Sequence, residues 1–234
     1  MTFPGRHGGG TDGRLRRSIR TLALLSALAL SACTRPAPPP APPSPTPPAF
    51  ASEIRPVTEA DVAGSWRPGC PVGPERLRLV RLTHWDFAGQ PRTGVLVVHE
   101  AVAADVVTVF DALFRQRFPI RQMRPVDVYG GDDAASMAAD NTSGFNCRRA
   151  VTEGAASWST HAYGRAIDVN PVENPYLFGG RVLPPAGAAY VDRGAYRPGM
   201  AVPDGVLVRA FAAVGWSWGG VWSNPDYQHF TTGR

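Results

Sequence analysis

Cysteine is scarce in this 234-residue chain, and none of its three cysteines stands in a CxxC pair. Zinc modules built on thiolates need such pairs, so a cysteine-ligated zinc site is excluded. Long hydrophobic runs are missing too, because the apolar segment at residues 21–30 is too short for a permanent membrane span. With 44% hydrophobic and 18% charged residues, the composition suits one globular domain with appendages.

An excess of positive charge is also missing from most of the chain. The formal net charge is +5, but five arginines and one aspartate in residues 1–20 account for four of these charges. The remainder carries about +1, which leaves no basic stripe to follow a phosphate backbone. Nucleic-acid binding is therefore excluded.

The N-terminus has the pattern of an export signal. A basic segment followed by a short apolar run predicts a signal peptide at residues 1–32. The signal ends in LSAC, which resembles a bacterial lipobox and implies a diacylglyceryl group on Cys33, with cleavage before it. A soluble secreted protein whose signal happens to contain a cysteine is the alternative.

A proline-rich segment separates this signal from the rest of the chain. Nine of residues 36–48 are proline, which favours an extended polyproline II spacer of roughly 40 Å. We therefore predict a lipidated N-terminus and linker at residues 33–49, and a single domain at residues 50–234. An anchor, a spacer and a domain are the layout of a tethered enzyme that reaches into a cell wall.

The two remaining cysteines form an even pair in an exported protein. Because export leads to an oxidising compartment, we predict that Cys70 and Cys147 are bonded. If the bond acts by restricting the unfolded chain, closing a loop of this length adds at most about 4.5 kcal/mol to the free energy of unfolding. Two buried thiols are the alternative.

Hydrophobic periodicity predicts an α+β domain with an antiparallel sheet and helices packed on it. Strands and helices segregate along the chain, whereas a parallel sheet would need them to alternate. The expected elements, in chain order, are hairpin strands at 77–84 and 95–99, a helix at 101–118 ended by Pro119, a short helix at 133–140, a strand at 166–169, a helix at 206–214 ended by Gly215, and strands at 216–222 and 228–231.

Two short segments supply a candidate metal centre. The first, SxHxxGxAxD, carries His161 and Asp168, and the second, DxxH, carries Asp226 and His229. Three N/O ligands leave the fourth position of a tetrahedral Zn²⁺ open for water, and the metal lowers the pKa of that water to about 7. An unligated carboxylate can then accept the proton.

Each of these residues also has an ordinary structural explanation. A single histidine is usually a core or surface residue, and an aspartate beside proline often caps a turn. Two other histidines compete for a metal role. His84 stands at a strand end, and His99 stands at a strand-to-helix junction where a local hydrogen bond is expected. Trp216, Trp218 and Trp222 are expected in the core and are not assigned to the site.

In combination, SxHxxGxAxD, WGG and DxxHF resemble the zinc D-alanyl-D-alanine carboxypeptidase family of bacterial cell-wall peptidases. The likeness extends upstream through SWRPGCP, LVVH and DNTSGFNCR, so it covers most of residues 65–230. The resemblance implies a Hedgehog/DD-peptidase-like α+β fold. It also implies zinc ligands at His161, Asp168 and His229, with Asp226 as the general base.

The family resemblance further implies a substrate-binding arginine. Many members carry it in a contiguous SGYR, whereas here SGF is separated from Arg148 by two residues, and Arg149 follows. Arg148 is the preferred candidate.

The activity implied by the resemblance is zinc-dependent hydrolysis of an amide bond in the peptidoglycan stem peptide. The protein is expected to be a monomeric D-alanyl-D-alanine carboxypeptidase, lipid-anchored in the cell membrane and facing the cell wall.

One alternative is an L-alanyl-D-glutamate endopeptidase. Another is a non-catalytic zinc-containing cell-wall binding module, as in Hedgehog signalling domains, but the carboxylate at Asp226 favours an enzyme. A purely structural envelope lipoprotein would leave the metal residues unexplained.

Replacement of Cys33 by alanine tests the export hypothesis. We expect Cys33→Ala to abolish incorporation of a radiolabelled fatty acid and to release the protein to the medium or leave it unprocessed. Fractionation and autoradiography of both proteins measure this. Unchanged anchoring, together with an unlabelled native protein, would contradict the hypothesis.

Overall fold

The computed structural model describes residues 48–151 and 157–233. The chain divides into two units, Met1–Pro45 and Thr46–Arg234, and all described residues belong to the second. The predicted signal peptide, Cys33 and nearly all of the predicted linker lie outside the described residues. Within the described part, no helix has the length and apolar composition needed to cross a membrane.

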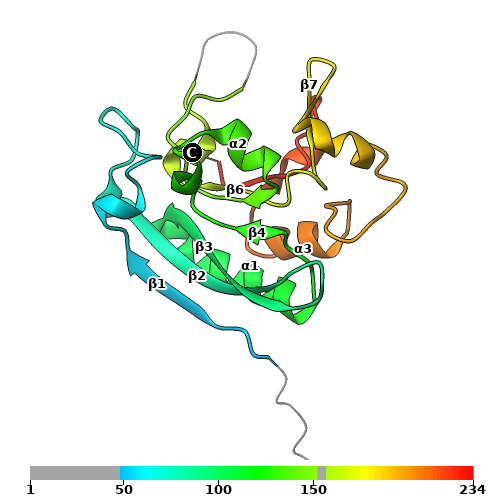
Figure 1. Cartoon of the computed structure of the whole chain (residues 1–234), viewed down its shortest axis with the longest axis horizontal. Helices are drawn as coiled ribbons and strands as arrows, with labels where there is room; N and C mark the ends of the chain where they lie inside the picture. Colours follow the sequence, from blue (N-terminus) through cyan, green and yellow to red (C-terminus); the bar gives the residue numbers. More distant parts are fainter. Residues whose placement is uncertain (1–47, 152–156, 234) are drawn as a thin grey trace, which may run out of the picture. The chain divides into compact units, whose positions relative to one another are not determined.

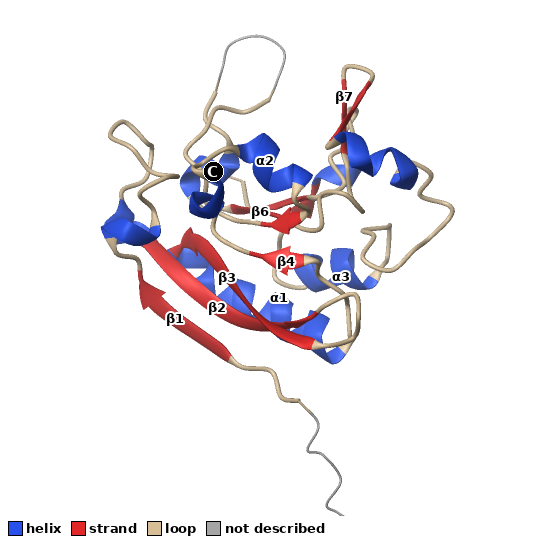
Figure 2. Ribbon diagram, in the orientation of Figure 1, coloured by secondary structure: helices blue, strands red, loops and turns tan. Residues whose placement is uncertain are grey.

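The described unit mixes helices with mostly antiparallel strands, so the α+β prediction is confirmed (Figures 1 and 2). Its first sheet is antiparallel with the order β1–β2–β3. β2 (Leu77–Trp85) and β3 (Pro91–His99) form the predicted hairpin, and the Asp86 carboxylate accepts two backbone N–H groups in its turn. β1 (Ser52–Pro56) was not predicted, because it is an edge strand without buried side chains and shows no hydrophobic pattern.

Helix α1 (Ala103–Arg115) packs against this sheet through an apolar stripe. In Figure 2 it lies behind β2 and β3. The stripe consists of Ala103, Val106, Val109, Phe110, Leu113 and Phe114. Each large side chain that becomes fully buried contributes about 1.5–3 kcal/mol, so this interface is a main part of the core.

The prediction that Pro119 ends this helix is wrong. The helix ends at Arg115 because Arg117 adopts a left-handed backbone conformation with φ of 52°. The N–H groups of Arg117 and Phe118 donate to the carbonyls of Phe114 and Leu113, both at 3.0 Å. This is a Schellman motif, in which glycine usually occupies the left-handed position.

The second sheet is antiparallel with the order β6–β10–β9. β6 (Ala166–Asp168) and β10 (His229–Thr231) match two predicted strands. β9 (Ser217–Trp218) is only two residues long, so the strand predicted at residues 216–222 is mostly wrong. The chain turns instead into a 3₁₀ helix at Gly219–Val221.

Helix α3 (Val206–Ala212) joins this second sheet to α1. Phe211 on α3 stacks on Phe230 of β10 with ring centroids 4.2 Å apart, and its edge meets Phe110 of α1. The predicted helix is confirmed, with the left-handed Gly215 just beyond its end.

Smaller elements complete the unit. α2 (Asp133–Ala138) is a short helix, β4 (Gln122–Met123) and β5 (Asn141–Thr142) pair in parallel, and β7 (Tyr176–Phe178) and β8 (Arg181–Leu183) form a hairpin. Other short 3₁₀ helices lie at Glu59–Asp61, Pro74–Arg76, Glu100–Val102, Val126–Tyr129, Thr160–Tyr163 and Pro185–Tyr190.

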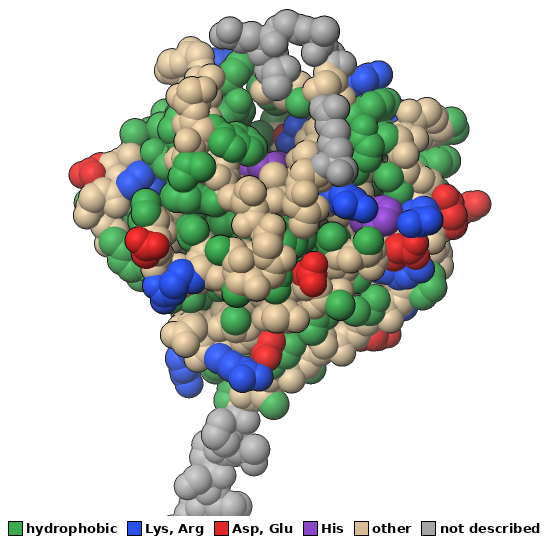
Figure 3. All heavy atoms as spheres, turned by 180° about the vertical axis from the view of Figure 1, so that it is seen from behind, with side chains coloured by type: hydrophobic (Ala, Val, Ile, Leu, Met, Phe, Trp, Pro, Cys, Tyr) green, Lys and Arg blue, Asp and Glu red, His purple; other side chains and the backbone are tan. Residues whose placement is uncertain are grey.

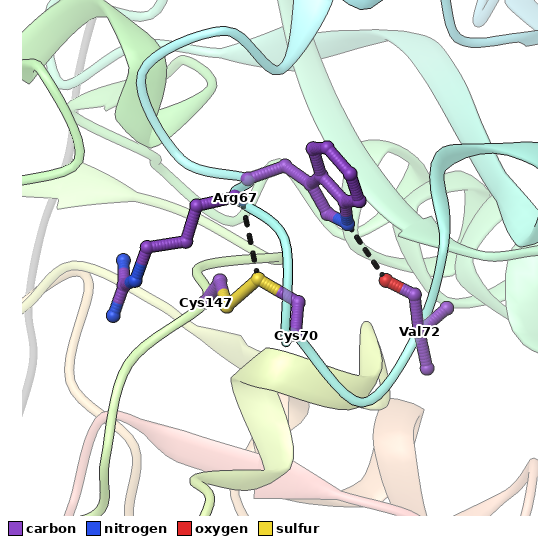
Figure 4. The surroundings of a disulfide bond; sticks show 5 residues. Arg67, Cys70, Val72 and Cys147 are labelled. Carbon is purple, nitrogen blue, oxygen red and sulfur yellow. Dashed lines mark hydrogen bonds between the residues drawn. A yellow bond between two sulfur atoms is a disulfide. The ribbon is translucent and has the colours of Figure 1, made fainter.

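Cys70 and Cys147 form a disulfide with their Cα atoms 5.9 Å apart (Figure 4). The Arg67 backbone N–H lies 3.3 Å from the Cys70 sulfur. Cys147 is fully buried in a second apolar cluster with Val62, Leu77, Val97 and Phe145. The bond therefore ties the loop before β2 to the segment that leads into Arg148.

Removal of the disulfide should destabilise the domain. Because the bond restricts the unfolded chain, the double variant Cys70→Ala/Cys147→Ala is expected to lose about 2–5 kcal/mol in free energy of unfolding. Urea denaturation followed by tryptophan fluorescence measures this. Fully reduced wild-type protein should approach the same midpoint, and a variant as stable as oxidised wild type would contradict the expectation.

Candidate metal centre

Three side chains from separate elements converge in the described unit. His161 lies in the Thr160–Tyr163 3₁₀ helix, Asp168 ends β6, and His229 begins β10. His161 Nε2 is 3.1 Å from Asp168 Oδ2, and His229 Nδ1 is 3.0 Å from Asp168 Oδ1. The two histidine nitrogens are 3.2 Å apart. All three residues are buried.

Local sequence brings His161 back toward β6. Ser159 caps the 3₁₀ helix by accepting the His161 N–H, and Gly164 ends the helix with φ of 66°. A Cβ at Gly164 would lie 2.6 Å from the His99 backbone nitrogen, and that nitrogen donates to the Gly164 carbonyl. Glycine is therefore required twice, for its left-handed conformation and for its close approach to β3.

Hydrogen bonds to the outer nitrogens orient both imidazoles. His161 Nδ1 is 2.6 Å from the Gly144 carbonyl, which can only accept, so this nitrogen carries the hydrogen and Nε2 presents its lone pair to the centre. His229 Nε2 is 3.2 Å from the Thr160 hydroxyl oxygen. If it donates there, Nδ1 also turns a lone pair inward. Such second partners are typical of metal-ligating histidines.

The spacing of the three inner atoms fits a metal ion. Lone pairs separated by 3.0–3.2 Å repel one another unless a cation or proton lies between them. Ligands placed about 2.0–2.2 Å from a tetrahedral zinc lie roughly 3.3–3.6 Å apart, so only small shifts are needed. Burial opposes ionisation of Asp168, but coulombic attraction and hydrogen bonds from the two histidines, which stand where a metal cation would otherwise act, outweigh it and hold its pKa well below the usual value. The group could therefore hold a metal ion.

Asp226 lies beside this group and is not one of its three members. The residue is partly exposed, but its Oδ1 atom is buried and lacks a hydrogen-bond partner among the described residues. Burial, reinforced by the negative charge of Asp168, raises the pKa of the Asp226 carboxyl to about 7, against the opposing charges of His229 and Arg148. The carboxyl can thus change protonation near neutral pH.

The WGG segment positions Asp226 through the backbone. The Asp226 N–H donates to the Gly219 carbonyl at 3.0 Å, and a Cβ at Gly219 would lie only 2.8 Å from the Asp226 carbonyl oxygen. On its other side, Asp226 forms a β-bridge with Tyr176 of β7. The sequence pattern predicts a strand in this segment and gives no sign of this role.

A cavity of about 430 Å³ opens onto these groups. In Figure 3 one face of the molecule is hollowed, with a histidine surface visible inside and hydrophobic side chains around it. Asp168, Asp226 and His229 line the cavity together with Arg148. Arg148 forms an ion pair with Asp133 at 2.8 Å from Nε to Oδ1.

Several cavity residues have no signal in the sequence. Trp222 lines the cavity with its ring centroid 5.3 Å from that of His229, whereas Trp216 and Trp218 are buried in the core as expected. Tyr176, on β7, also lines the cavity. These residues join the site only through long-range folding. The one sequence feature that indicates a turn before Trp222 is the pair Gly219–Gly220, which interrupts the strand pattern.

The other candidate residues lie elsewhere. Neither His84 nor His99 belongs to the convergent group found in the described residues. His99 accepts the Ala101 N–H at 3.1 Å, the local role expected for it, and burial lowers the pKa of both histidines. Arg149 stacks on Trp158, with its guanidinium 3.8 Å from the ring centroid, and does not line the cavity as Arg148 does.

Comparison with known proteins agrees with this geometry. Residues 152–232 match the family model described as D-alanyl-D-alanine carboxypeptidase. This segment, which contains Asp226 and the three convergent residues, is similar to that peptidase family. Comparison with curated proteins and with solved structures gave no match.

Removal of either histidine should abolish metal binding. We expect wild type to bind one divalent ion per chain, and His161→Ala and His229→Ala to bind none, because each loses one of three ligand atoms. His84→Ala is the control and should bind as wild type does. Titration with Zn²⁺ and Co²⁺, followed by metal analysis of gel-filtered protein, measures the stoichiometry. Full occupancy in His229→Ala would refute this ligand set.

Proposed function

We propose that this protein is a zinc-dependent peptidase that hydrolyses an amide bond in the peptidoglycan stem peptide, acting as a D-alanyl-D-alanine carboxypeptidase. The observation that carries the proposal is the placement of Asp226. A shielded carboxyl lies beside a His–Asp–His group, does not belong to it, and faces a cavity. A carboxyl in this place suits a general base for peptide hydrolysis, which favours an enzyme over a non-catalytic binding module.

His161, Asp168 and His229 would hold the zinc ion. When bound, zinc supplies a Lewis acid that polarises a carbonyl and lowers the pKa of water. The histidines would contribute neutral imidazole nitrogens, and their outer hydrogen bonds to Gly144 and Thr160 keep these nitrogens directed inward.

Asp226 would act as the general base and then as the general acid. A carboxyl with a pKa near 7 can accept a proton from the attacking water and later donate it to the leaving amine nitrogen. Its Oδ1 has no hydrogen-bond partner among the described residues, so no bond to that atom has to break for the first transfer. The backbone contact with Gly219 restrains the residue during both transfers.

Arg148 would stabilise the negative charge that develops on the scissile carbonyl oxygen, or bind a substrate carboxylate. Its planar guanidinium suits either role.

One observation favours cleavage of an internal bond, as in an L-alanyl-D-glutamate endopeptidase. Arg148 is the only arginine or lysine among the described cavity-lining residues. In a carboxypeptidase the oxyanion and the terminal carboxylate of the substrate would compete for it, whereas an internal bond presents only the oxyanion.

The N-terminal sequence supports a place of action. A lipid on Cys33 and a proline-rich spacer would tether the peptidase to the cell membrane on its outer side, within reach of the cell wall. Stem peptides would be its substrates, and the near-neutral charge of the domain gives no support to a nucleic-acid partner.

Asp226→Asn tests the proposed function. The variant keeps the size of the side chain but loses the proton acceptor, so turnover should fall by about 10²–10⁴-fold, or about 2.7–5.5 kcal/mol of barrier. Metal binding and folding should be retained. Turnover is measured by mass spectrometry of products from a pentapeptide ending in D-Ala-D-Ala and from whole muropeptides.

The exposed Asp204 offers a matched control. Its φ of 56° also suits asparagine, so Asp204→Asn should fold normally and cut as wild type does. Cleavage confined to an internal bond of muropeptides would select the endopeptidase activity. A wild type that binds zinc and cuts neither substrate would overturn the proposal.

A further inference from the structure

One ion pair at the rim of the cavity has no part in the mechanism above. Asp133 and Arg148 both line the cavity, and their side chains are 21% and 22% exposed. Arg148 is the only arginine or lysine among the described lining residues, and residues 152–156 contain neither type. A role for this arginine in the proposed function therefore depends on what directs its side chain.

The backbone of Arg148 is fixed, but the backbone alone does not direct the guanidinium. The Cys147 N–H donates to Ser65, Cys147 is bonded to Cys70, and the Arg148 carbonyl accepts the Ser159 N–H at 3.1 Å. The side chain beyond Cα has several rotatable bonds, whose freedom must be removed by contacts of its own.

Asp133 supplies one such contact, and the Arg149 carbonyl, which accepts from Arg148 Nη1 at 3.4 Å, supplies another. The Asp133 Oδ1 is 2.8 Å from Arg148 Nε. The Nε N–H makes no hydrogen bond among the described residues, so the pair acts through charge, and the carboxylate draws the guanidinium toward α2. The same Oδ1 is 3.4 Å from the Asn146 side-chain nitrogen.

Asp133 is itself held in place, and it is linked to the metal residues. It is the first residue of α2, whose start is capped by the Asp132 side chain accepting the Ala135 N–H. Asn146 donates its backbone N–H to the His161 carbonyl at 3.2 Å. A chain of contacts thus runs from His161 through Asn146 to Asp133.

We propose that Asp133 is a positioning residue, which holds the Arg148 guanidinium at the cavity beside Asp226. This inference rests on the proposed function. Asp133 does not touch substrate in this account and acts only through Arg148. A purely structural alternative is that an acidic residue in the first turn of α2 stabilises the helix, and the two roles give different results in a double-variant experiment.

The experiment compares Asp133→Asn, Arg148→Gln, the double variant and Asp132→Asn in the metal-loaded protein. Asp133→Asn should lower kcat by about 10–10²-fold with little change in KM, because misplacement of a catalytic group costs that much. Arg148→Gln should lower kcat by about 10²–10³-fold. The double variant should be no slower than Arg148→Gln, since in this proposal Asp133 affects turnover only through Arg148.

Asp132→Asn is the matched control, because it removes a charge from the same helix start and keeps a capping side chain. It should cut within about twofold of wild type, because asparagine caps a helix about as well as aspartate does. A loss in Asp132→Asn equal to that in Asp133→Asn would overturn the proposal in favour of a helix effect. The same fold-loss from Asp133→Asn in the wild-type and Arg148→Gln backgrounds would also overturn it.

A crystal structure of Asp133→Asn gives a readout that does not depend on turnover. The Arg148 guanidinium should leave its position at the cavity while α2 stays folded. An unmoved guanidinium overturns the positioning role, even if activity falls. If wild type cleaves no peptide, the proposed function fails, and this structure still decides whether Asp133 positions Arg148.

Discussion

The antiparallel pairing of β6 with β10 is the constraint on which the site depends. Its register sets His229 opposite Asp168 and, one residue on, Phe230 opposite Ile167. Ile167 and Phe230 are fully buried in the core, where Phe230 stacks on Phe211. Because side chains alternate across a strand, a slip of one residue would expose Phe230 and carry His229 to the core face. Burial of the two apolar neighbours therefore specifies where the two ligand candidates meet.

The environment gives two nearby carboxyls opposite properties. Asp168 is buried between two imidazoles, which outweigh the cost of burial and keep it ionised. The Asp226 carboxyl is shielded and has an oxygen without a partner, and its pKa is raised to about 7. Groups whose environments push their pKa values apart are suited to different tasks. Asp168 is suited to bind a cation, and Asp226 is suited to exchange a proton.

The sequence predicted secondary structure and site residues correctly where the pattern that indicates them is local. Periodicity located the β2–β3 hairpin and both longer helices, and the rare combination of residue types in SxHxxGxAxD and DxxH located the residues that converge. It failed where the signal was absent or long-range. β1 has no buried side chain to create a pattern, and the end of α1 uses Arg117 where glycine is usual. Trp222 reaches the cavity only because the chain folds back after two glycines.

Those two glycines show how a departure from regular structure can serve a site. β9 stops at Trp218, and the next residue has no room for a side chain against the Asp226 carbonyl. The backbone of Gly219 instead binds the Asp226 N–H, while the Leu177 N–H on β7 binds the carbonyl of Pro225. Asp226 is thereby fixed by main-chain contacts from both sides, which leaves its carboxyl unengaged by them. For a general base, geometry matters before pKa, and here the geometry comes from backbone groups that no side-chain pattern reveals.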